Sequence, residues 1–504
     1  MDLYNQITYW AETKPTLPVF INETGTLTYE ELFKQSAALS VFLEEMLGDD
    51  PSPVLIYGHM QLAMLPCFIG TVKSGRAYIP VDSSIPLERV QKIIEDSDTK
   101  AILALSSLPF EITAQKFVIT STNLEERFRQ YEGRSLPHHK EVRGDDTFYI
   151  IYTSGSTGNP KGVQISYDNL IYFSEWLIKD FHLENNQRFL NQAPFSFDLS
   201  VMDLYPGILT GGTLWAISKD LVGNPKALFH QLSQSCLDVW TSTPSFVEMC
   251  LAFEGFSAEL LPNLNVFLFC GETLSAETVK KLYARFPESI VYNTYGPTET
   301  TVAVTQLRVT DEILNEYKTL PIGEQKNSKV MILNDQLKEL ENGEKGQIII
   351  LGSSVSKGYY KQKELTDKAF FFYKGKPAYK TGDLGYFKDG YLFYAGRMDF
   401  QIKLNGYRIE IEDIEVHLRN LDLVDQAIVV PVFKEGKCQQ IIAAAVVKNH
   451  DFEKEYQLTS FLRKELVKKI PSYMIPRKFI YVESIPMTNN GKIDRKKISS
   501  EVLL

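Results

Sequence analysis

The chain has 504 residues, of which 44% are hydrophobic and 23% are charged, and its formal net charge is −10. At roughly 100–200 residues per domain, this length predicts two to four structural units with sizeable cores. The composition is that of a globular protein and argues against a disordered or fibrous chain. Because an acidic chain repels phosphate backbones, we expect no nucleic-acid partner.

The five cysteines are scattered and show no CxxC spacing: Cys67, Cys236, Cys250, Cys270 and Cys438. This pattern argues against a disulfide framework or a zinc site and favours a reducing compartment. The first residues lack the basic region and apolar run of a signal peptide, and no apolar stretch approaches the ~20 residues that cross a bilayer. We therefore expect a cytoplasmic monomer without stable membrane insertion.

Short apolar runs alternate with helical patterns through most of the chain. The runs predict buried strands at residues 54–58, 101–105, 148–152 and 266–269. Helical spacing predicts helices over residues 87–96 and 276–286. Strands that alternate with helices imply largely parallel sheets covered by helices, which is an α/β fold.

The pattern changes near residue 397. Strand-like runs at 426–432 and 440–447 are separated by a turn-like segment, and an amphipathic helix over 458–470, closed by Pro471, precedes a last strand at 478–482. We interpret residues 397–504 as a small α+β domain and residues 1–396 as a larger α/β domain.

A segment rich in glycine and hydroxyl groups, TSGSTGNPKG at residues 153–162, follows one of the predicted strands. Glycines let backbone N–H groups approach an anion, the hydroxyls add donors and Lys161 adds charge, so the composition is typical of a phosphate-binding loop. The Walker pattern requires Gly-Lys followed by Ser or Thr. Here Lys161 precedes Gly162, so a P-loop nucleoside triphosphatase is not indicated. A flexible surface loop is the structural alternative.

This string resembles the signature of the adenylate-forming superfamily, which contains acyl-CoA synthetases, luciferases and the adenylation domains of peptide synthetases. Further segments resemble that family's other motifs, in order and at suitable spacing: residues 73–82, 293–301, 379–384, 396–410 and 490–494. The resemblance covers nearly the whole chain. It implies a large N-terminal domain of helix-covered, mostly parallel sheets with a small β-barrel-like part, and a small mobile α+β C-terminal domain.

The resemblance also implies an ATP-dependent, AMP-forming ligase whose large domain binds ATP and an amino acid. Asn293 and Tyr295 would surround adenine, and Thr298 would contact phosphate. Glu299 would hold Mg²⁺, which neutralises the triphosphate. A solvated turn is the structural alternative for this segment.

The resemblance also implies a binding site for the ribose of ATP, formed by Asp383 and Arg397. Asp383, in what looks like a turn at the end of a strand, would accept both ribose hydroxyls, and Arg397 would reach the same ribose. An Asp383–Arg397 ion pair is a structural alternative that is compatible with this role. The complete set implied for ATP is Thr153, Ser154, Gly155, Thr157, Lys161, Asn293, Thr294, Tyr295, Gly296, Pro297, Thr298, Asp383, Tyr394, Arg397 and Lys492.

Lys492 lies in a predicted loop near the end of the sequence. Alone, such a lysine indicates only a solvated charge, but within residues 490–494 it resembles the family's catalytic lysine, which contacts both ATP and substrate. A positioned ammonium would relieve negative charge as a carboxylate attacks the α-phosphorus, an effect typically worth ~3–4 kcal/mol. The resemblance places Lys403 on a second catalytic face, which is a second surface of the small domain that takes part in catalysis. It places Asp399 at the hinge about which the small domain rotates between the half-reactions.

Residues 195–202 resemble the segment that opens the acyl pocket. Members that activate amino acids have an aspartate at the position of Asp198, which pairs with the substrate ammonium; the structural alternative is a helix N-cap or turn aspartate. Met202 and Cys270 are large enough to restrict the pocket to a small side chain such as glycine, alanine or serine, although Cys270 also fits a buried hydrophobe. The implied lining is Leu199, Met202, Ser245, Leu268, Cys270, Thr294, Val302 and Ala303.

Within the superfamily, the stand-alone length and the small pocket resemble ligases that attach D-alanine to the phosphopantetheine thiol of a carrier protein for teichoic acid D-alanylation. The preference for D over L comes from this resemblance alone. Fewer residues follow Lys492 than the ~40 that a fused carrier domain needs, so we expect a separate carrier. A basic segment would dock an acidic carrier or is ordinary surface charge: Arg463, Lys464, Lys468, Lys469, Arg477, Lys478, Lys492, Arg495, Lys496 and Lys497.

Two rival functions remain open. The first is a ligase for another small amino acid or carboxylate, with a carrier protein or coenzyme A as acceptor, and Asp198 argues against a fatty acid. The second is a non-catalytic regulator that binds a nucleotide or an amino acid on the same scaffold. The intact Glu299, Asp383, Lys403 and Lys492 argue against that regulator.

Overall fold

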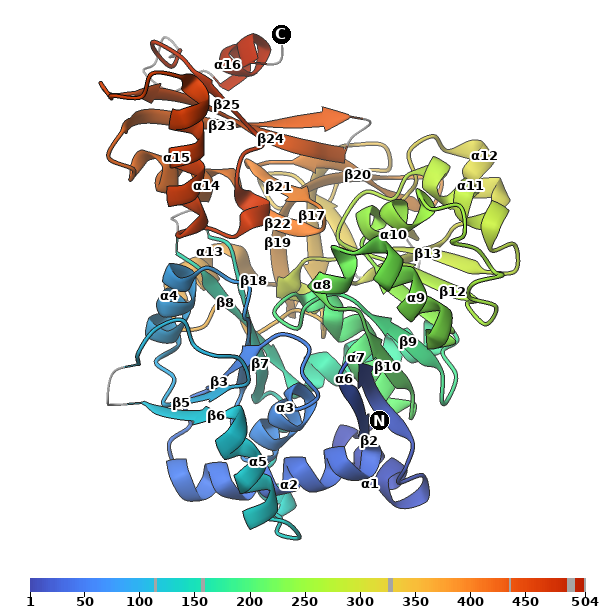
Figure 1. Cartoon of the computed structure of the whole chain (residues 1–504). Coiled ribbons are helices and arrows are strands. Elements are labelled where there is room, and N and C mark those ends of the chain that lie inside the picture. The colour runs from blue at the N-terminus through green and yellow to red at the C-terminus, as the bar shows by residue number, and fades with distance from the viewer. Residues whose placement is uncertain (113–115, 156–158, 325–329, 435–436, 487–494, 503–504) are drawn as a thin grey trace.

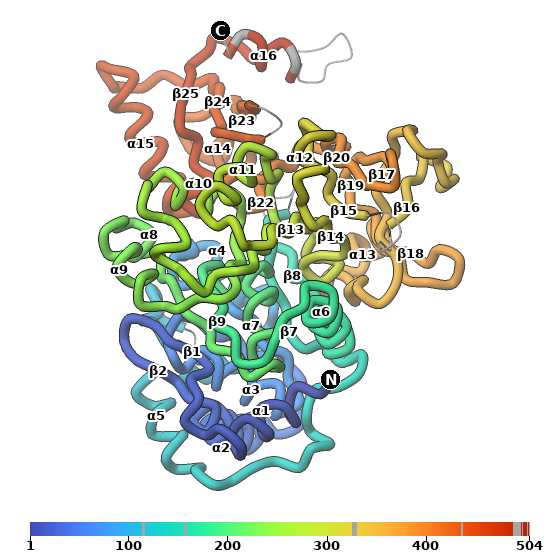
Figure 2. The backbone as a smooth tube through the Cα atoms, turned by 90° about the vertical axis from the view of Figure 1, so that its right-hand side faces the viewer, coloured from blue at the N-terminus to red at the C-terminus, as the bar shows by residue number. Residues whose placement is uncertain are grey.

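The computed structural model describes residues 1–112, 116–155, 159–324, 330–434, 437–486 and 495–502. A large body contains three sheets, and a small C-terminal domain lies at one end of it (Figure 1). Figure 2 shows the same arrangement from the side, with the small domain at the opposite end from the helices nearest the N-terminus. Within these described ranges, no helix is long and apolar enough to cross a membrane.

The first sheet has six strands in the order β6-β5-β3-β4-β7-β8, and only β8 runs antiparallel to its neighbour. The strands are β3 (Val54–Gly58), β4 (Tyr78–Asp82), β5 (Ala101–Ala104), β6 (Phe117–Thr120), β7 (Thr147–Thr153) and β8 (Lys161–Ser166). Every residue of β3, β4 and β5 is buried, which explains their continuous apolar runs.

The second sheet has eight strands in the order β14-β13-β12-β11-β9-β10-β1-β2, and its inner strands are parallel. The antiparallel strands β2 and β14 form its two edges. The strands are β1 (Pro18–Asn22), β2 (Gly25–Thr28), β9 (Arg188–Asn191), β10 (Thr213–Ala216), β11 (Val239–Ser242), β12 (Val266–Phe269), β13 (Ile290–Tyr295) and β14 (Thr305–Arg308).

Helices cover these two sheets, and several of them begin at a side-chain cap. Thr28 and Glu31 form a capping box at the start of α2, and Ser166 with Asn169 does the same for α6. The helices are α1 (Leu3–Thr13), α2 (Tyr29–Leu47), α3 (Met64–Lys73), α4 (Leu87–Ser97), α5 (Ser121–Gln130), α6 (Tyr167–Asp180), α7 (Val201–Leu209), α8 (Lys219–Val222), α9 (Pro225–Ser235), α10 (Pro244–Leu251), α11 (Ala276–Arg285) and α12 (Asp311–Glu316).

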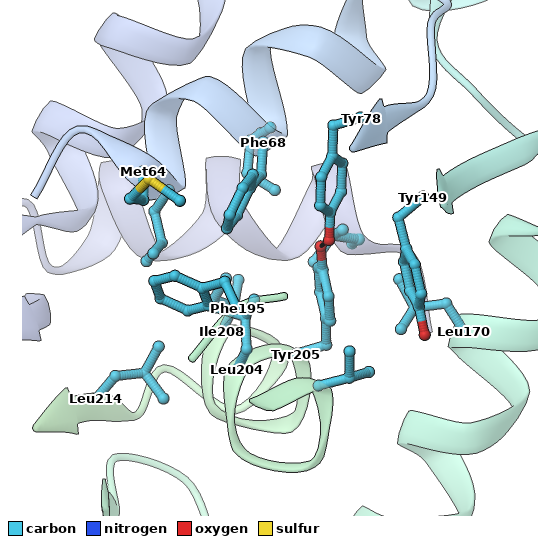
Figure 3. Packing of buried hydrophobic residues seen from close by; sticks show 14 of the residues in the cluster. Met64, Phe68, Tyr78, Tyr149, Leu170, Phe195, Leu204, Tyr205, Ile208 and Leu214 are labelled. Carbon is cyan, nitrogen blue, oxygen red and sulfur yellow. Dashed lines mark hydrogen bonds between the residues drawn. The ribbon is translucent and has the colours of Figure 1, made fainter. Parts of the chain in front are cut away.

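The largest hydrophobic cluster joins the two sheets through α3 and α7. Its centre is aromatic: the hydroxyls of Tyr78 and Tyr205 lie 2.5 Å apart, and the rings of Phe68 and Tyr78 stack at 4.4 Å (Figure 3). Phe195 meets Phe68 edge to face at 5.2 Å. Phe195 and Met202, the two ends of the segment 195–202, both belong to this cluster, so the segment with the predicted substrate aspartate is packed at both ends.

A third sheet is antiparallel, in the order β15-β20-β19-β17-β16, with β18 paired to β19. Its elements are β15 (Gly323–Glu324), β16 (Val330–Leu333), β17 (Gly346–Leu351), α13 (Lys363–Ala369), β18 (Phe370–Tyr373), β19 (Lys376–Lys388) and β20 (Tyr391–Arg397). The predicted turn at Asp383 is wrong, because Asp383 lies inside the long strand β19. Gly382 with φ +74° and a register shift at Leu384/Gly385 interrupt that strand and explain the turn-like pattern.

The small domain has a hydrophobic cluster of its own, drawn from residues 402–479. Its elements are β21 (Gln401–Leu404), β22 (Tyr407–Glu410), α14 (Ile411–Arg419), β23 (Val424–Lys434), β24 (Lys437–Val447), α15 (Glu455–Val467), β25 (Lys478–Tyr481) and α16 (Arg495–Val502). Helix α15 ends before the predicted residue 470, because the residue before Pro471 is restricted to extended conformations. The boundary at 396/397 and the mobility of this domain stay predictions.

Candidate active site

Three cavities meet around the hairpin β21–β22, where the small domain contacts the large one. The first, of about 680 Å³, is lined by Asn293, Tyr295, Asp383 and Tyr394. The second, of about 40 Å³, is lined by Asp198, Cys270, Thr298, Val302 and Lys403. The third, of about 930 Å³, is lined by Gly155, Lys161, Arg397, Asp399 and Arg408. Most of the predicted site residues, far apart in the sequence, therefore lie in one region.

The glycine-rich loop connects two paired strands: β7 ends at Thr153, β8 begins at Lys161, and these two residues are register partners. A Cβ at Gly155 would lie 2.3 Å from the Asn159 carbonyl oxygen, so only glycine fits there. The Ser154 hydroxyl donates to the Arg408 carbonyl at 3.0 Å. Thr157 lies outside the described residues, and phosphate binding by this loop stays a prediction.

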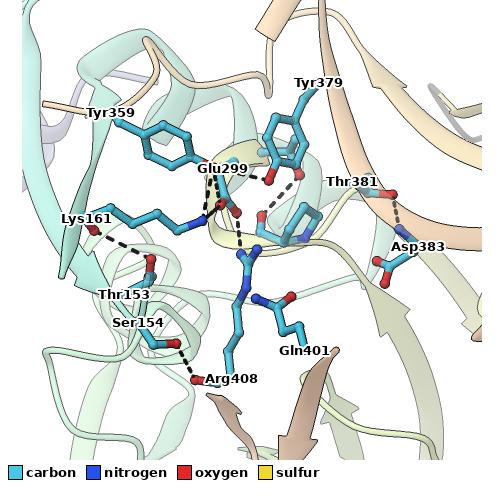
Figure 4. Close-up of polar contacts among 12 residues, drawn as sticks. Thr153, Ser154, Lys161, Glu299, Tyr359, Tyr379, Thr381, Asp383, Gln401 and Arg408 are labelled. Carbon is cyan, nitrogen blue, oxygen red and sulfur yellow. Dashed lines mark hydrogen bonds and ion pairs between the residues drawn. The ribbon is translucent and has the colours of Figure 1, made fainter. Parts of the chain in front are cut away.

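Glu299 is the centre of a buried charge network (Figure 4). It lies in the short helix η3 (Thr298–Thr300), directly after β13, and is 0% exposed. Its carboxylate accepts from Arg408 Nη1 at 2.6 Å and from the Tyr359 hydroxyl at 2.8 Å, and Lys161 Nζ lies 3.4 Å away. Burial alone would raise the pKa of Glu299, but Arg408 and then Lys161 hold that pKa well below its usual range.

The predicted ribose site contains the predicted ion pair. Asp383 is buried, and its carboxylate accepts from the Tyr295 hydroxyl at 2.5 Å and from Arg397 Nη1 at 2.8 Å. Arg397 also donates to Asp399 through Nε and Nη2, both at 2.6 Å. A carboxylate has about four lone-pair sites, so Asp383 retains acceptor capacity for a ribose hydroxyl. Asn293 is buried, and its amide donates to the Pro321 carbonyl at 2.8 Å.

Asp198 begins the short helix η2 (Asp198–Ser200) and is 7% exposed. The N-cap residue of η2 is Phe197 and that of α7 is Ser200, so Asp198 is not the predicted alternative of a helix N-cap. Burial raises the pKa of Asp198 to about 6, and Thr298 and Lys403 partly oppose that rise. A buried carboxylate of this kind is suited to receive an ammonium.

The small cavity beside Asp198 limits what fits there. Its volume of about 40 Å³ holds only a few water-sized groups, which agrees with a small amino acid. Leu199, Cys270 and Val302, which the resemblance places in the substrate pocket, line this cavity. Their contact with the substrate stays a prediction. Met202 and Leu268 are fully buried in the main hydrophobic cluster and do not line this cavity. Their effect on the pocket is through the packing behind it.

We expect the half-saturating concentration of the amino acid to rise as the pH falls through about 6, the raised pKa of Asp198. Below that pH the buried carboxylate takes up a proton and no longer pairs with the substrate ammonium, so binding weakens about tenfold per pH unit. Steady-state kinetics between ~pH 5 and ~pH 8 would measure this. The half-saturating concentration of ATP is the internal control. A flat profile for the amino acid across this range would contradict the role of Asp198.

The residues predicted for the second catalytic face and the hinge lie on the small-domain side. Lys403, on β21, lines both the 680 Å³ and the 40 Å³ cavities, and its charge lowers the pKa of Asp198. Asp399 lies two residues before the start of β21 and is held by Arg397. Lys492 lies outside the described residues. The catalytic and hinge roles of these residues stay predictions.

Several functional contacts were missed by the sequence reasoning. Arg408 was part of a matched segment, but no pattern in the sequence indicated that its side chain would reach Glu299. Tyr359 lies in no predicted motif, yet its hydroxyl contacts both Glu299 and Lys161. Both contacts join residues that are more than 50 positions apart, which local patterns do not reveal.

The basic C-terminal segment is partly engaged within the protein. Arg463 donates to the Pro476 carbonyl, Lys468 pairs with Glu465, and Lys469 pairs with Glu88 on α4. Arg495 forms a two-point contact with the buried Glu415, with both distances 2.7 Å. Lys464, Arg477 and Lys478 are exposed. Docking of a carrier on this segment stays a prediction.

Family models match both parts of the chain. The AMP-binding enzyme model matches residues 7–360, and the AMP-binding enzyme C-terminal domain model matches residues 413–492. The chain therefore belongs to the AMP-binding enzyme family. This membership confirms the resemblance to adenylate-forming enzymes.

Relatives of the same length share about half of its residues. The chain is 52% identical over 506 residues to the D-alanine–D-alanyl carrier protein ligase of Bacillus licheniformis. It is 52% identical over 508 residues to the protein of the same name from Bacillus cereus, and both alignments cover the whole of each chain. The Vibrio cholerae adenylation domain AlmE, in complex with glycyl-adenosine-5′-phosphate, matches the fold with a TM-score of 0.84 at 23% identity, covering 100% of this chain and 98% of that one.

Proposed function

We propose that this chain uses ATP to convert D-alanine into D-alanyl-AMP and pyrophosphate. It then transfers the D-alanyl group to the phosphopantetheine thiol of a separate carrier protein, for D-alanylation of teichoic acid. The observation that carries this proposal is the 52% identity, over the full length, to ligases whose name states the joining of D-alanine to a D-alanyl carrier protein. The buried Asp198, which lines a small cavity, supports it independently, because a buried carboxylate is suited to pair with the ammonium of an amino acid.

In the first half-reaction, the D-alanine carboxylate attacks the α-phosphorus of ATP. A C–O–P linkage forms and the bond to pyrophosphate breaks. Asp198 holds the substrate ammonium, Asn293 and Tyr295 border adenine, and Asp383 accepts from the ribose. Lys492 would place its ammonium where negative charge develops, and binding of the reactants side by side lowers the entropic part of the barrier.

The residues present fit Mg²⁺ as a cofactor. In the described part of the chain, no group of three or more His, Cys, Asp or Glu side chains could hold a metal. Glu299, to which the resemblance assigns the metal, would be the protein ligand, and phosphate oxygens would complete the site. This arrangement is typical of Mg²⁺, which often binds through one or two carboxylates and substrate phosphates. When bound, the ion neutralises the triphosphate.

In the second half-reaction, a thiolate attacks the acyl carbon of D-alanyl-AMP, a thioester forms and AMP leaves. The 680 Å³ cavity is bordered by Gly271 and Glu272 of the large domain and by Pro431 and Phe433 of the small domain. A narrow thiol-bearing arm could enter between these two domains. Lys403, which lines both that cavity and the cavity beside Asp198, would face the reacting acyl group.

Loading of a carrier protein tests this proposal. The enzyme would be incubated with ATP, Mg²⁺, D-alanine and a phosphopantetheinylated D-alanyl carrier protein, and the intact mass of the carrier would be measured. We expect the mass to rise by one alanyl group. The carrier without phosphopantetheine is the control and should not change. Loading of coenzyme A in preference to the carrier would instead support a ligase that uses coenzyme A.

We also propose that the protein is a monomer located in the cytoplasm.

A further inference from the structure

The carboxylate of Glu299 is held by partners from both domains. Lys161, at the start of β8, and Tyr359, just before α13, belong to the large domain and contact Oε1. Arg408 belongs to β22 of the small domain and contacts Oε2 at 2.6 Å. Two cationic side chains therefore neutralise this buried carboxylate: Lys161 belongs to the same domain as Glu299, and Arg408 belongs to the small domain.

The hairpin that carries Arg408 is fitted closely against the large domain. The Gly406 amide donates to Glu272 Oε1 at 2.7 Å, and a Cβ at Gly406 would lie 2.4 Å from Thr243 Cγ2. The Ser154 hydroxyl, from the glycine-rich loop, holds the Arg408 carbonyl. Arg408 therefore reaches Glu299 only while the hairpin occupies this position.

Access to Glu299 is closed in this arrangement. The residue is 0% exposed, and Arg408 covers Oε2, which is the oxygen that Tyr359 and Lys161 leave open. Mg²⁺ bonds a carboxylate oxygen at ~2.0–2.1 Å, and the guanidinium 2.6 Å from the buried Oε2 both repels a second cation and fills the space beside that oxygen, so Arg408 opposes metal binding there while it stays in place. When Arg408 leaves, Glu299 keeps Lys161 and loses its closest counter-charge.

We propose that Arg408 and the Mg²⁺ of the bound nucleoside triphosphate compete for Oε2 of Glu299. This competition couples the departure of pyrophosphate and its metal to closure of the hairpin β21–β22. Arg408 is thus a positioning residue. It holds the hairpin β21–β22 in the position described here, with Lys403 lining the cavity beside Asp198, after the metal has left, and it yields when Mg²⁺ and ATP bind. The inference rests on the proposed function, because it assigns Glu299 to the metal.

Nucleotide binding without turnover tests the competition. Calorimetry would compare wild type, Arg408→Gln and Arg408→Lys, using Mg²⁺ with a non-hydrolysable ATP analogue and, separately, AMP without metal. Because a ligand that must displace an internal competitor binds more weakly, Arg408→Gln should bind the Mg²⁺ complex at least about tenfold more tightly than wild type and AMP about equally. Arg408→Lys retains the charge and should lie nearer wild type.

The matched control is Arg419→Gln, the same substitution on α14 of the same domain, where the side chain is 40% exposed and lies 3.8 Å from Glu415. It should bind both ligands as wild type does. Equal affinity of wild type and Arg408→Gln for the Mg²⁺ complex would overturn the competition.

Hydrogen exchange on the unaltered protein provides a second measurement, which does not depend on folding of a variant. Backbone amides of residues 401–410 should be protected with AMP and should exchange faster with the Mg²⁺–analogue complex. Unchanged protection at saturation would overturn the inference. If amino-acid-dependent pyrophosphate exchange is nevertheless intact, the proposed function stands. If the wild type shows no such exchange, the proposed function itself fails.

Discussion

Replacing Asp198 with alanine is expected to raise the half-saturating concentration of D-alanine by about 10²- to 4 × 10³-fold, because loss of one partner of a buried ion pair costs ~3–5 kcal/mol. Asp198 is 7% exposed and lines a 40 Å³ cavity, so little water can replace the lost carboxylate. The half-saturating concentration of ATP should change little, since the nucleotide residues line the larger neighbouring cavity.

Steady-state kinetics with D-alanine and ATP varied in turn would measure this difference. Asp220→Ala is a matched control, because Asp220 is an exposed aspartate on α8 of the same large domain. Asp198→Asn keeps the shape of the side chain and removes its charge, so it should resemble Asp198→Ala. Equal effects of the Asp198 variants on both substrates would show that Asp198 does not hold the ammonium.

Replacing Lys492 with alanine should reduce the rate of D-alanyl-AMP formation by about 10²- to 10³-fold, while ATP still binds. The ammonium is expected to act where charge develops on the phosphates, so its loss affects the transition state more than the ground state. Transfer of the acyl group from preformed D-alanyl-AMP to the carrier should persist, because the second half-reaction is assigned to the opposite face, with Lys403.

Pyrophosphate exchange, calorimetric ATP binding and single-turnover transfer would separate these effects. Lys448→Ala is the control, since Lys448 is an exposed lysine just after β24 of the same domain and is not part of the basic segment predicted to dock the carrier. An unchanged exchange rate in Lys492→Ala would remove this lysine from the reaction. Loss of ATP binding would instead indicate a role in holding the ground state.

The buried strands were the most predictable part of the fold. The strand predicted at 266–269 coincides with β12. All residues of β12 are buried, and this burial explains its apolar run. The predicted turn at Asp383 failed for the opposite reason: a glycine and a register shift occur inside β19, and their local pattern is the same as that of a strand end. Local chemistry does not distinguish an interrupted strand from a terminated one.

Motifs in the sequence predicted which residues belong to the candidate site, but they did not predict the side-chain contacts between the two domains. Asp383 and Arg397 were expected near the same ribose, and Arg397 Nη1 lies 2.8 Å from Asp383 Oδ1. The insertion of Arg408 beside Glu299 depends on how the small domain sits against the large one, which no local spacing specifies. The roles of Lys492 and Thr157 still depend on the sequence alone.

The most direct test of the account is amino-acid-dependent exchange of pyrophosphate into ATP. Purified enzyme with Mg²⁺ would be assayed with D-alanine, L-alanine, glycine, serine and a fatty acid. The account predicts the highest kcat/KM for D-alanine, weaker exchange with the other small amino acids and none with the fatty acid. Exchange supported best by the fatty acid, or by none of these acids, would contradict it.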